Sequence, residues 1–365
     1  MKTILISHNF SEISFSSMSY SLAHHLGDLG HKVIFISHKP YFSKKLTIKK
    51  TQGSIIIYSW PTEKRPTTLK DFFWFSKLYF QYKPDIVIGH FVGSNISVSM
   101  SKLLSLGRVN TYVYYHTLSE QLLLDEKKTS LKQKVKFIRK KIFYKFFCDI
   151  IVCPSELAKK DLKLFHNVDK AIVLLNPMID RFENKKNIEN DFIIISYLGR
   201  LDNSKGVVDL IKAYLLYKKE FRHSKIILKI AGTGAQENEI KELSKNNSSI
   251  EYFGGISYDK IDDYLNECHF SIIPSKFDAF NVVGIESLMN QTPLLISNEV
   301  GLADYLTDGK ECFKFDPNID SMVSLFSRVE NNIDYQVSMG FEARKTFLEK
   351  FSISTYCNKF SDILL

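Results

Sequence analysis

The sequence predicts an α/β fold of two doubly wound domains. Short apolar runs alternate with segments whose apolar residues follow the period of a helix, and this order occurs in both halves of the chain. The runs are continuously apolar, which is typical of parallel strands covered on both faces. At 365 residues the chain also exceeds the roughly 250 to 300 residues at which a single core stops growing, so we expect two domains.

The first half begins with a strand at Thr3–Ser7, followed by a helix that ends at Gly30. Later apolar runs in this half predict strands at residues 33–36, 54–58, 85–88, 112–115 and 149–152. The second half repeats the pattern, with strands predicted at residues 192–195, 226–230, 270–273 and 293–296.

A polar stretch at residues 180–191 separates the two sets of strands and is the predicted linker. We therefore place one domain at residues 1–178, a second at 179–345, and a C-terminal helix at 346–365 that packs back toward the first domain. Two such sheets facing each other bring the carboxyl ends of their strands to one cleft, where ligands of doubly wound sheets bind.

Composition excludes several classes of protein. With 44% hydrophobic and 24% charged residues the chain is neither disordered nor fibrous. No apolar run reaches the roughly 18 residues of a membrane span, and the start lacks the features of a signal peptide, so we expect a cytoplasmic protein. The five cysteines are scattered without a C-x-x-C pair, which indicates reduced thiols and no zinc site.

Charge divides the chain into unlike halves. Residues 1–180 hold 27 Lys and Arg against 13 Asp and Glu, a net charge of +14, whereas residues 181–365 hold 22 against 27, a net charge of −5. A basic half can attract nucleic acid, anionic lipid or an anionic small substrate, and composition does not choose among them.

One candidate anion site follows the first strand of the second half, in Gly199-Arg200-Leu201-Asp202-Asn203-Ser204-Lys205-Gly206. Arg200 leaves the carboxyl end of the strand and Lys205 stands at a helix start, within reach of one anion. A diphosphate is bound by such fixed positive charge beside a helix amino terminus. The alternative is a solvated loop with two surface cations.

A second candidate element runs from Asp278 to Glu286, again from a strand end into a helix. Two carboxylates can hold sugar hydroxyls, while the N–H groups near residues 281–283 hold phosphate. The alternatives are an acidic helix cap at Asp278 and a buried, satisfied carboxyl at Glu286.

Together the two elements resemble the signature of the family-4 retaining glycosyltransferases, whose fold is GT-B, with two facing Rossmann-like domains. Further landmarks stand in the family's order across nearly the whole chain. They are Gly30-His31-x-Val33, Asp85 to His90, Tyr115-His116-Thr117, Pro154-Ser155-Glu156, Asn176-x-x-x-Asp180, Ala231 to Gly234, Phe253-Gly254-Gly255 and Gly301 to Asp304.

The resemblance implies a role for each matching residue. Arg200 and Lys205 would bind the donor diphosphate and stabilise the leaving group, and Asp278 would hold hydroxyls of the transferred sugar. His116 would face that sugar; its alternative is a polar cap on a strand end. The remaining donor-binding positions would be Glu286 at the ribose, Gly232, Gly234, Gly255 and Ile256 at the base, and Asn281, Val282 and Val283 at the phosphate.

The sequence departs from the family pattern at four places. Ile13-Ser14 stands where a Gly-Gly turn is usual, so side chains occupy the approach of the backbone to the donor. Asp278 replaces a glutamate, and Asn281 and Gln291 replace glycines. These changes leave the charge of the donor site intact and put the identity of the sugar in doubt.

A basic segment, Lys127–Lys145, holds nine Lys and Arg residues and no acid, with apolar residues at helical spacing. Such a helix can lie on an anionic membrane, which we expect here. The alternative is a domain helix whose apolar stripe is core. We expect the aromatic-rich segment from Phe72 to Phe80 to be core rather than an acceptor platform.

We interpret the chain as a retaining hexosyltransferase that uses a nucleotide diphosphate sugar, with UDP favoured over GDP. The acceptor would be a hydroxyl of a glycan or lipid-linked glycan in bacterial-type surface polysaccharide synthesis, at the inner face of the cell membrane. No metal and no cofactor are expected. The alternative is a catalytically impaired family member that recognises glycans or acts as a chaperone. Nucleic-acid binding is not expected, because no readout motif is present.

Overall fold

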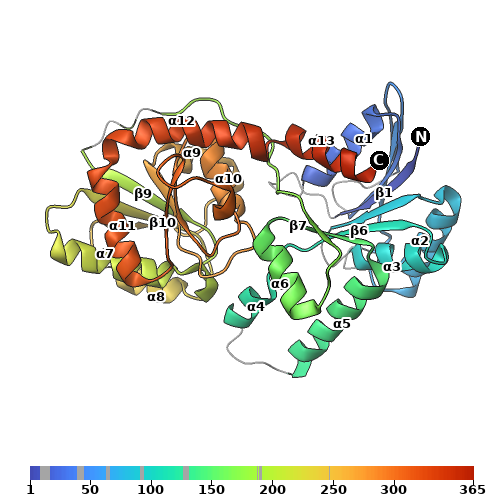
Figure 1. Ribbon diagram of the computed structural model, residues 1–365, viewed down its shortest axis with the longest axis horizontal. Coiled ribbons are helices and arrows are strands. Elements are labelled where there is room, and N and C mark those ends of the chain that lie inside the picture. The colour runs from blue at the N-terminus through green and yellow to red at the C-terminus, as the bar shows by residue number, and fades with distance from the viewer. Residues whose placement is uncertain are drawn as a thin grey trace.

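The computed structural model describes residues 1–8, 17–38, 45–62, 66–90, 94–125, 131–186, 188, 191–245 and 247–365. Two α/β domains lie side by side, each built around a mainly parallel sheet (Figure 1). The predicted fold class is therefore confirmed. Ile13-Ser14 lies outside the described residues.

The N-terminal sheet has eight strands in the order β3-β4-β2-β1-β5-β6-β7-β8. Only β3 is antiparallel to its neighbour, β4. The central strands are buried on both faces, because helices cover both sides of the sheet. The strands are β1 Thr3–Ser7, β2 Lys32–Ser37, β3 Leu46–Lys49, β4 Ser54–Ser59, β5 Ile86–Gly89, β6 Asn110–Tyr114, β7 Ile150–Cys153 and β8 Ala171–Val173.

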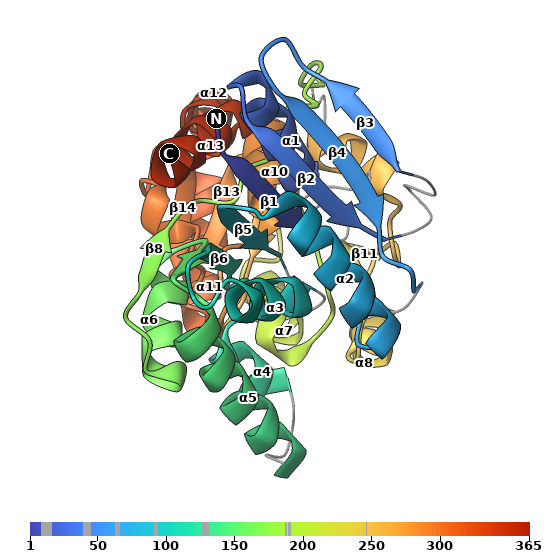
Figure 2. The ribbon, with the colours of Figure 1, turned by 90° about the vertical axis from the view of Figure 1, so that its right-hand side faces the viewer.

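Helices of the N-terminal domain form two layers. One layer covers the sheet face with Phe75, Val98 and Leu162 in its core, and Figure 2 shows α2, α3 and α5 of this layer beside one another. The other layer contains α1. The helices are α1 Met18–Asp28, α2 Leu69–Tyr82, α3 Asn95–Leu104, α4 Ser119–Asp125, α5 Leu131–Phe147 and α6 Glu156–His166.

The C-terminal sheet has six parallel strands in the order β11-β10-β9-β12-β13-β14. The strands are β9 Ile193–Leu198, β10 Ile226–Ala231, β11 Ile250–Tyr252, β12 Phe270–Ile273, β13 Leu294–Ser297 and β14 Cys312–Phe315. The helices are α7 Val207–Glu220, α8 Glu237–Ser244, α9 Ile261–Asn266, α10 Val282–Met289, α11 Ile319–Asn331, α12 Gln336–Thr346 and α13 Ile353–Leu364.

Four strands were missed from the sequence, namely β3, β8, β11 and β14. All four are edge strands of their sheets. An edge strand has one neighbour in its sheet, so it does not need the continuous apolar run that identified the central strands. Leu46–Lys49, for example, is mostly exposed. Strand β14 differs from the other three because most of it is buried, and there Lys314 interrupts the apolar run.

The chain returns to its first domain at the end. After α12 it crosses over the top of the molecule, and α13 lies beside α1 (Figure 1). Tyr356 and Phe360 are buried in one cluster with β1 and α1, and Lys2 Nζ donates to the carbonyl of Leu364 at 3.1 Å. The outgoing and returning crossings pair with each other, since Met178 N–H donates to Phe351 O at 2.8 Å.

Candidate functional site

A cavity of about 380 Å³ opens between the two domains, at the carboxyl ends of both sheets. The N-terminal domain contributes His116, Thr117 and Asn176. The C-terminal side contributes residues 197–200, Lys205, 272–273, 275 and 278–283. The cavity thus brings together His116, Arg200, Lys205, Asp278 and residues 281–283, which come from both halves of the sequence.

The two predicted cations lie at one wall of this cavity. Arg200 follows β9, and its side chain is 60% exposed and ion-paired with Asp202. Lys205 is far more enclosed, and its Nζ lies 2.6 Å from Asp278 Oδ2. Both cations are therefore paired with carboxylates, and the Arg200 side chain stays mostly exposed at the cavity wall.

Gly206 fixes the position of Lys205 against the neighbouring loop. Its φ is +70°, and a Cβ there would lie 2.2 Å from the carbonyl oxygen of Pro274. No residue with a side chain fits that approach. The glycine thus lets the Lys205 turn pack directly on the loop that carries Asp278.

Asp278 is organised by its own loop as well as by Lys205. Its side chain accepts hydrogen bonds from Asn281 Nδ2 at 2.9 Å and from the N–H of Phe280 at 3.4 Å. The residue is 7% exposed. The carboxylate is therefore partly enclosed but still borders the cavity, where sugar hydroxyls can donate to it.

Asn281 explains one departure from the family pattern. Its φ is +74°, in the left-handed region that favours glycine and tolerates asparagine. Its side-chain oxygen also accepts the N–H of Gly284 at 2.9 Å and so caps α10. Gln291 likewise has a positive φ, +55°, so a glycine-favouring backbone persists at both substituted positions.

The amino terminus of α10 points its first residues, Val282 and Val283, at the cavity. The first N–H groups of a helix have no partner within the helix and carry partial positive charge. Together with Arg200 and Lys205 they make this end of the cavity suited to a phosphate group.

His116 lies at the opposite, N-terminal side of the cavity. Its ring stacks on Tyr114 with 5.2 Å between centroids, and Tyr114 stacks in turn on His90 at 3.8 Å. Burial lowers the pKa of His116 to about 3. His116 is therefore neutral near pH 7 and faces a ligand as an uncharged hydrogen-bonding group.

Glu286 does not line the cavity. It stands in the second turn of α10, is 2% exposed, and lies 3.6 Å from Arg181. Arg181 also donates to Asp262 at 2.8 Å and stacks on Tyr258. Burial raises the pKa of Glu286 to about 7, although Arg181 opposes the shift.

The four residues expected at the nucleotide base lie on two loops next to the cavity rather than in its wall. Gly232 N–H donates to Gly254 O at 2.7 Å, which joins the loops that follow β10 and β11. Gly199 N–H donates to Ala231 O at 3.1 Å, which joins them to the Arg200 turn. The two loops thus lie at the carboxyl edge of the sheet, next to the Arg200 turn. They carry Gly232, Gly234, Gly255 and Ile256.

Sequence reasoning missed Asp125, which reaches the anion site from the other domain. Its Oδ1 accepts the N–H of Ser204 at 3.0 Å, and its Oδ2 lies 3.9 Å from Arg200. Arg181 and Asp262 were missed as well. No local motif marks any of these residues, because each acts across a long separation in sequence. Among the residues that the structure describes, no three potential ligands gather as a metal site requires.

Comparison with known families matches the two halves of the chain separately. Residues 16–181 match the model described as Glycosyltransferase Family 4, and residues 178–346 match the model described as Glycosyl transferases group 1. Together the matches run through both domains and meet at the crossing beside Met178.

Individual relatives are distant. An uncharacterized glycosyltransferase of Methanocaldococcus jannaschii is 28% identical over 59% of this chain and 60% of its own length. The phosphatidylinositol N-acetylglucosaminyltransferase gpi3 subunit of Schizosaccharomyces pombe is 22% identical over 87% of this chain and 70% of its own length. This chain thus spans less than two thirds of the archaeal protein.

Among solved structures, HepE of Anabaena in complex with UDP-glucose superposes with a TM-score of 0.71. The alignment covers 100% of this chain and 99% of HepE at 10% sequence identity. At that identity the likeness concerns the fold, a pair of facing α/β domains around one cleft.

Proposed function

Because the chain belongs to the family-4 glycosyltransferases and has their GT-B fold, we propose that it transfers a hexose from a nucleotide diphosphate sugar to an acceptor hydroxyl. One observation carries the proposal. Arg200, Lys205, Asp278 and the amino terminus of α10 converge on a single interdomain cavity, although the first two lie more than 70 residues from the others in sequence.

The donor diphosphate binds at the cationic wall. Arg200 and Lys205 balance its negative charge, and the N–H groups at the start of α10 donate hydrogen bonds to the phosphate oxygens. As the bond to the sugar breaks, negative charge grows on the leaving diphosphate, and these fixed groups stabilise it. UDP is the favoured nucleotide, with GDP as the second candidate; the UDP-glucose complex of the structurally similar HepE supports this order.

The sugar occupies the space between Asp278 and His116. Asp278 accepts hydrogen bonds from its hydroxyls, and neutral His116 contacts it from the N-terminal domain. We propose that transfer retains the configuration of the sugar, as the resemblance implies. No metal ion takes part in the proposed step, because the protein's own cations meet the diphosphate charge.

The ribose role of Glu286 requires a rearrangement. Its carboxyl lies behind the cavity and beside Arg181, so a ribose must draw it out of that pair or approach along α10. The base then rests on the loops of Gly232 and Gly255, next to the Arg200 turn.

We propose an acceptor on a glycan or lipid-linked glycan, in bacterial-type surface polysaccharide synthesis at the inner face of the cell membrane. The name of the fission-yeast relative, which includes phosphatidylinositol, supports an acceptor of lipid type. We propose that contact with the bilayer is peripheral. None of the described helices is long and apolar enough to cross a membrane.

A catalytically impaired glycan-recognising or chaperone subunit is the competing function. Its case rests on Ile13-Ser14, Asp278 and Asn281. The Asn281 part of this case is weak, because asparagine keeps the left-handed backbone at this position and its side chain caps α10.

A panel of nucleotide sugars tests the proposal, with thermal stabilisation and slow donor hydrolysis as readouts. We expect one UDP- or GDP-hexose to raise the melting temperature of the protein and to be hydrolysed slowly. Because no metal ion takes part in the proposed step, both effects should persist in excess chelator. Arg200→Ala and Lys205→Ala should each weaken nucleoside diphosphate binding by about tenfold or more, since charge-assisted contacts contribute about 1.5 to 3 kcal/mol each.

Lys212→Ala is the matched control, because Lys212 is an exposed cation of the same domain on the outer side of α7. If the Arg200, Lys205 and Lys212 variants all bind nucleotide as the parent does, the diphosphate assignment is wrong. Binding without any hydrolysis or transfer would favour the impaired family member.

A further inference from the structure

Helix α5 turns its apolar stripe to solvent. Val135, Ile138, Ile142 and Phe146 recur at helical spacing on one side of the helix and are between 47 and 64% exposed. The side toward the sheet is formed instead by residues such as Phe143 and Tyr144. The alternative in which the Val135–Phe146 stripe is core is therefore wrong.

Basic side chains flank this stripe on both sides. At 100° per residue, Lys134, Lys141 and Lys145 fall on one side of it and Arg139 on the other, and all four are exposed. Lys140 differs, because it turns toward the domain and burial lowers its pKa. No acid interrupts Lys127–Lys145, so the exposed part of α5 presents apolar groups and positive charge only.

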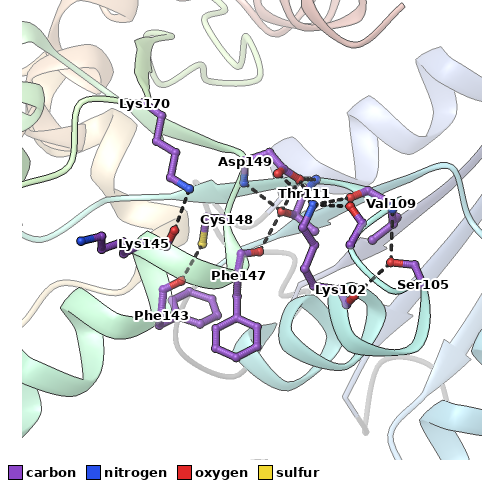
Figure 3. A network of polar contacts seen from close by, with 11 residues as sticks. Lys102, Ser105, Val109, Thr111, Phe143, Lys145, Phe147, Cys148, Asp149 and Lys170 are labelled. Carbon is purple, nitrogen blue, oxygen red and sulfur yellow. Dashed lines mark hydrogen bonds and ion pairs between the residues drawn. The ribbon is translucent and has the colours of Figure 1, made fainter.

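Polar contacts anchor α5 in this orientation at its C-terminal end (Figure 3). Thr111 Oγ1 donates to the carbonyl of Phe147 at 2.8 Å, and Lys170 Nζ donates to the carbonyl of Lys145 at 2.9 Å. Thr111 is itself held by Asp149, which pairs with Lys102 at 2.7 Å. The last carbonyls of the helix are thus tied to β6 and to Lys170, the residue before β8.

Helix α2 adds aromatic side chains to the same layer. Phe72, Phe73 and Phe80 are 42, 68 and 57% exposed, whereas Phe75 and Tyr79 are buried. The expectation that the whole segment from Phe72 to Phe80 is core is therefore wrong for its outward residues. Helices α2, α3 and α5 cover one face of the sheet (Figure 2).

We infer that the outer side of this layer, Val135–Phe146 of α5 with Phe72, Phe73 and Phe80 of α2, is a docking surface for an anionic membrane. Exposed apolar and aromatic side chains beside lysines and arginines match the boundary between anionic headgroups and acyl chains. A symmetric contact with a second copy would instead place two sets of these cations against each other.

Helix α5 is linked to the cavity through its neighbours, because α5 packs on α6, α6 packs on α4, and α4 packs on the 3₁₀ turn that ends at Lys205. Helix α4 directly precedes the segment that leads into α5, and Asp125 at its end accepts the N–H of Ser204 in the donor element. A membrane that binds α5 therefore contacts the domain whose helix α4 reaches the donor element. That the membrane presents the acceptor there rests on the proposed function; the docking surface itself does not.

Flotation of the full-length protein with vesicles tests the surface. We expect binding to vesicles of equal parts phosphatidylcholine and phosphatidylglycerol, a decrease with added salt, and little binding to phosphatidylcholine alone. Nucleoside diphosphate affinity is measured on every variant, so that loss of docking is separated from loss of fold or of donor binding.

Two variants remove the two components of the surface. A charge variant changes Lys134, Arg139 and Lys141 to Gln and should weaken vesicle binding by about a hundredfold. An apolar variant changes Ile138 and Phe146 to Gln and should weaken it at least tenfold. The control for the charge variant changes three exposed lysines, Lys212, Lys219 and Lys345, to Gln. The control for the apolar variant changes the similarly exposed Val337 and Phe341 of α12 to Gln.

Vesicle binding that is equal in the variants and their controls would overturn the inference, as would equal binding to neutral vesicles. Self-association that both variants abolish, without vesicle binding, would assign the surface to a second copy. If the protein binds vesicles but hydrolyses no nucleotide sugar, the docking surface is supported and the proposed function is contradicted.

Discussion

Asn281 shows how a single residue can depart from a family motif and preserve its geometry. The backbone there is left-handed, and the side chain caps α10. Asn281→Gly should therefore cost only a few tenths of a kcal/mol in the free energy of unfolding, whereas Asn281→Ala should cost about 1 to 2 kcal/mol through backbone strain and the lost cap. Denaturant unfolding measures both. Equal cost in the two variants would show that φ is not what selects this residue.

Glu286 makes stability depend on pH. Its folded pKa, about 7, lies above the ordinary value of 4.5, so the folded protein binds more protons than the unfolded chain between these values. The contribution of Glu286 to the free energy of unfolding is thus fully present below about pH 4.5 and is lost as the pH rises through about 7. The full loss is about 3 kcal/mol.

Glu286→Gln should remove this part of the pH dependence, as unfolding titrations near pH 5 and pH 8 would reveal. Glu242→Gln, at an exposed position on α8, serves as the control. The same slope in both variants would mean that Arg181 keeps Glu286 charged throughout.

At the scale of elements, α4 meets the 3₁₀ turn at Asn203–Lys205 across the domain boundary. The Asp125 carboxylate lies beside Ser204 N–H and Arg200. Its negative charge repels a phosphate that binds at these two groups. Asp125→Asn should therefore raise nucleoside diphosphate affinity by about three- to tenfold, since removing one nearby like charge is worth about 1 kcal/mol at a partly exposed site.

Isothermal titration of UDP and GDP into this variant checks the effect of Asp125. Glu120→Gln changes an acid of the same helix that does not approach the turn and should leave affinity unchanged. A lower affinity for Asp125→Asn would mean instead that the carboxylate shapes the donor loop.

At the scale of the whole molecule, the last helix belongs structurally to the first domain. Phe360 is fully buried against β1 and α1. Phe360→Ala should destabilise the N-terminal domain by about 3 to 5 kcal/mol. Hydrogen exchange should then show lost protection in β1 and β5 but not in β9. Ile363→Ala, on the partly exposed side of the same helix, should change neither region, and uniform loss in both sheets would mean that the domains unfold as one unit.

The central strands could be predicted because burial on both faces demands continuous apolar residues, as in Val33–Ile36 and Ile226–Ile230. The edge strands could not be predicted, because β3, β8 and β11 are partly exposed and Lys314 interrupts the apolar run of the buried β14. Three cavity residues could be predicted because each is charged and lies between a predicted strand and a predicted helix. They are Arg200, Lys205 and Asp278. Asp125 and Arg181 carried none, since their partners lie 79 and 81 residues away.

The sequence by itself determined the two-domain α/β plan, the family and the positive charge of Arg200 and Lys205 at the cavity, because these depend on periodicity and short motifs. Only the tertiary structure decided which side of α5 faces solvent, that Glu286 is paired with Arg181 behind the cavity, and that Asp125 reaches the Arg200 turn from the other domain. The physical reason is that burial depends on which elements pack together. Helical spacing defines an apolar stripe, but only packing determines whether the stripe meets a core or is left exposed.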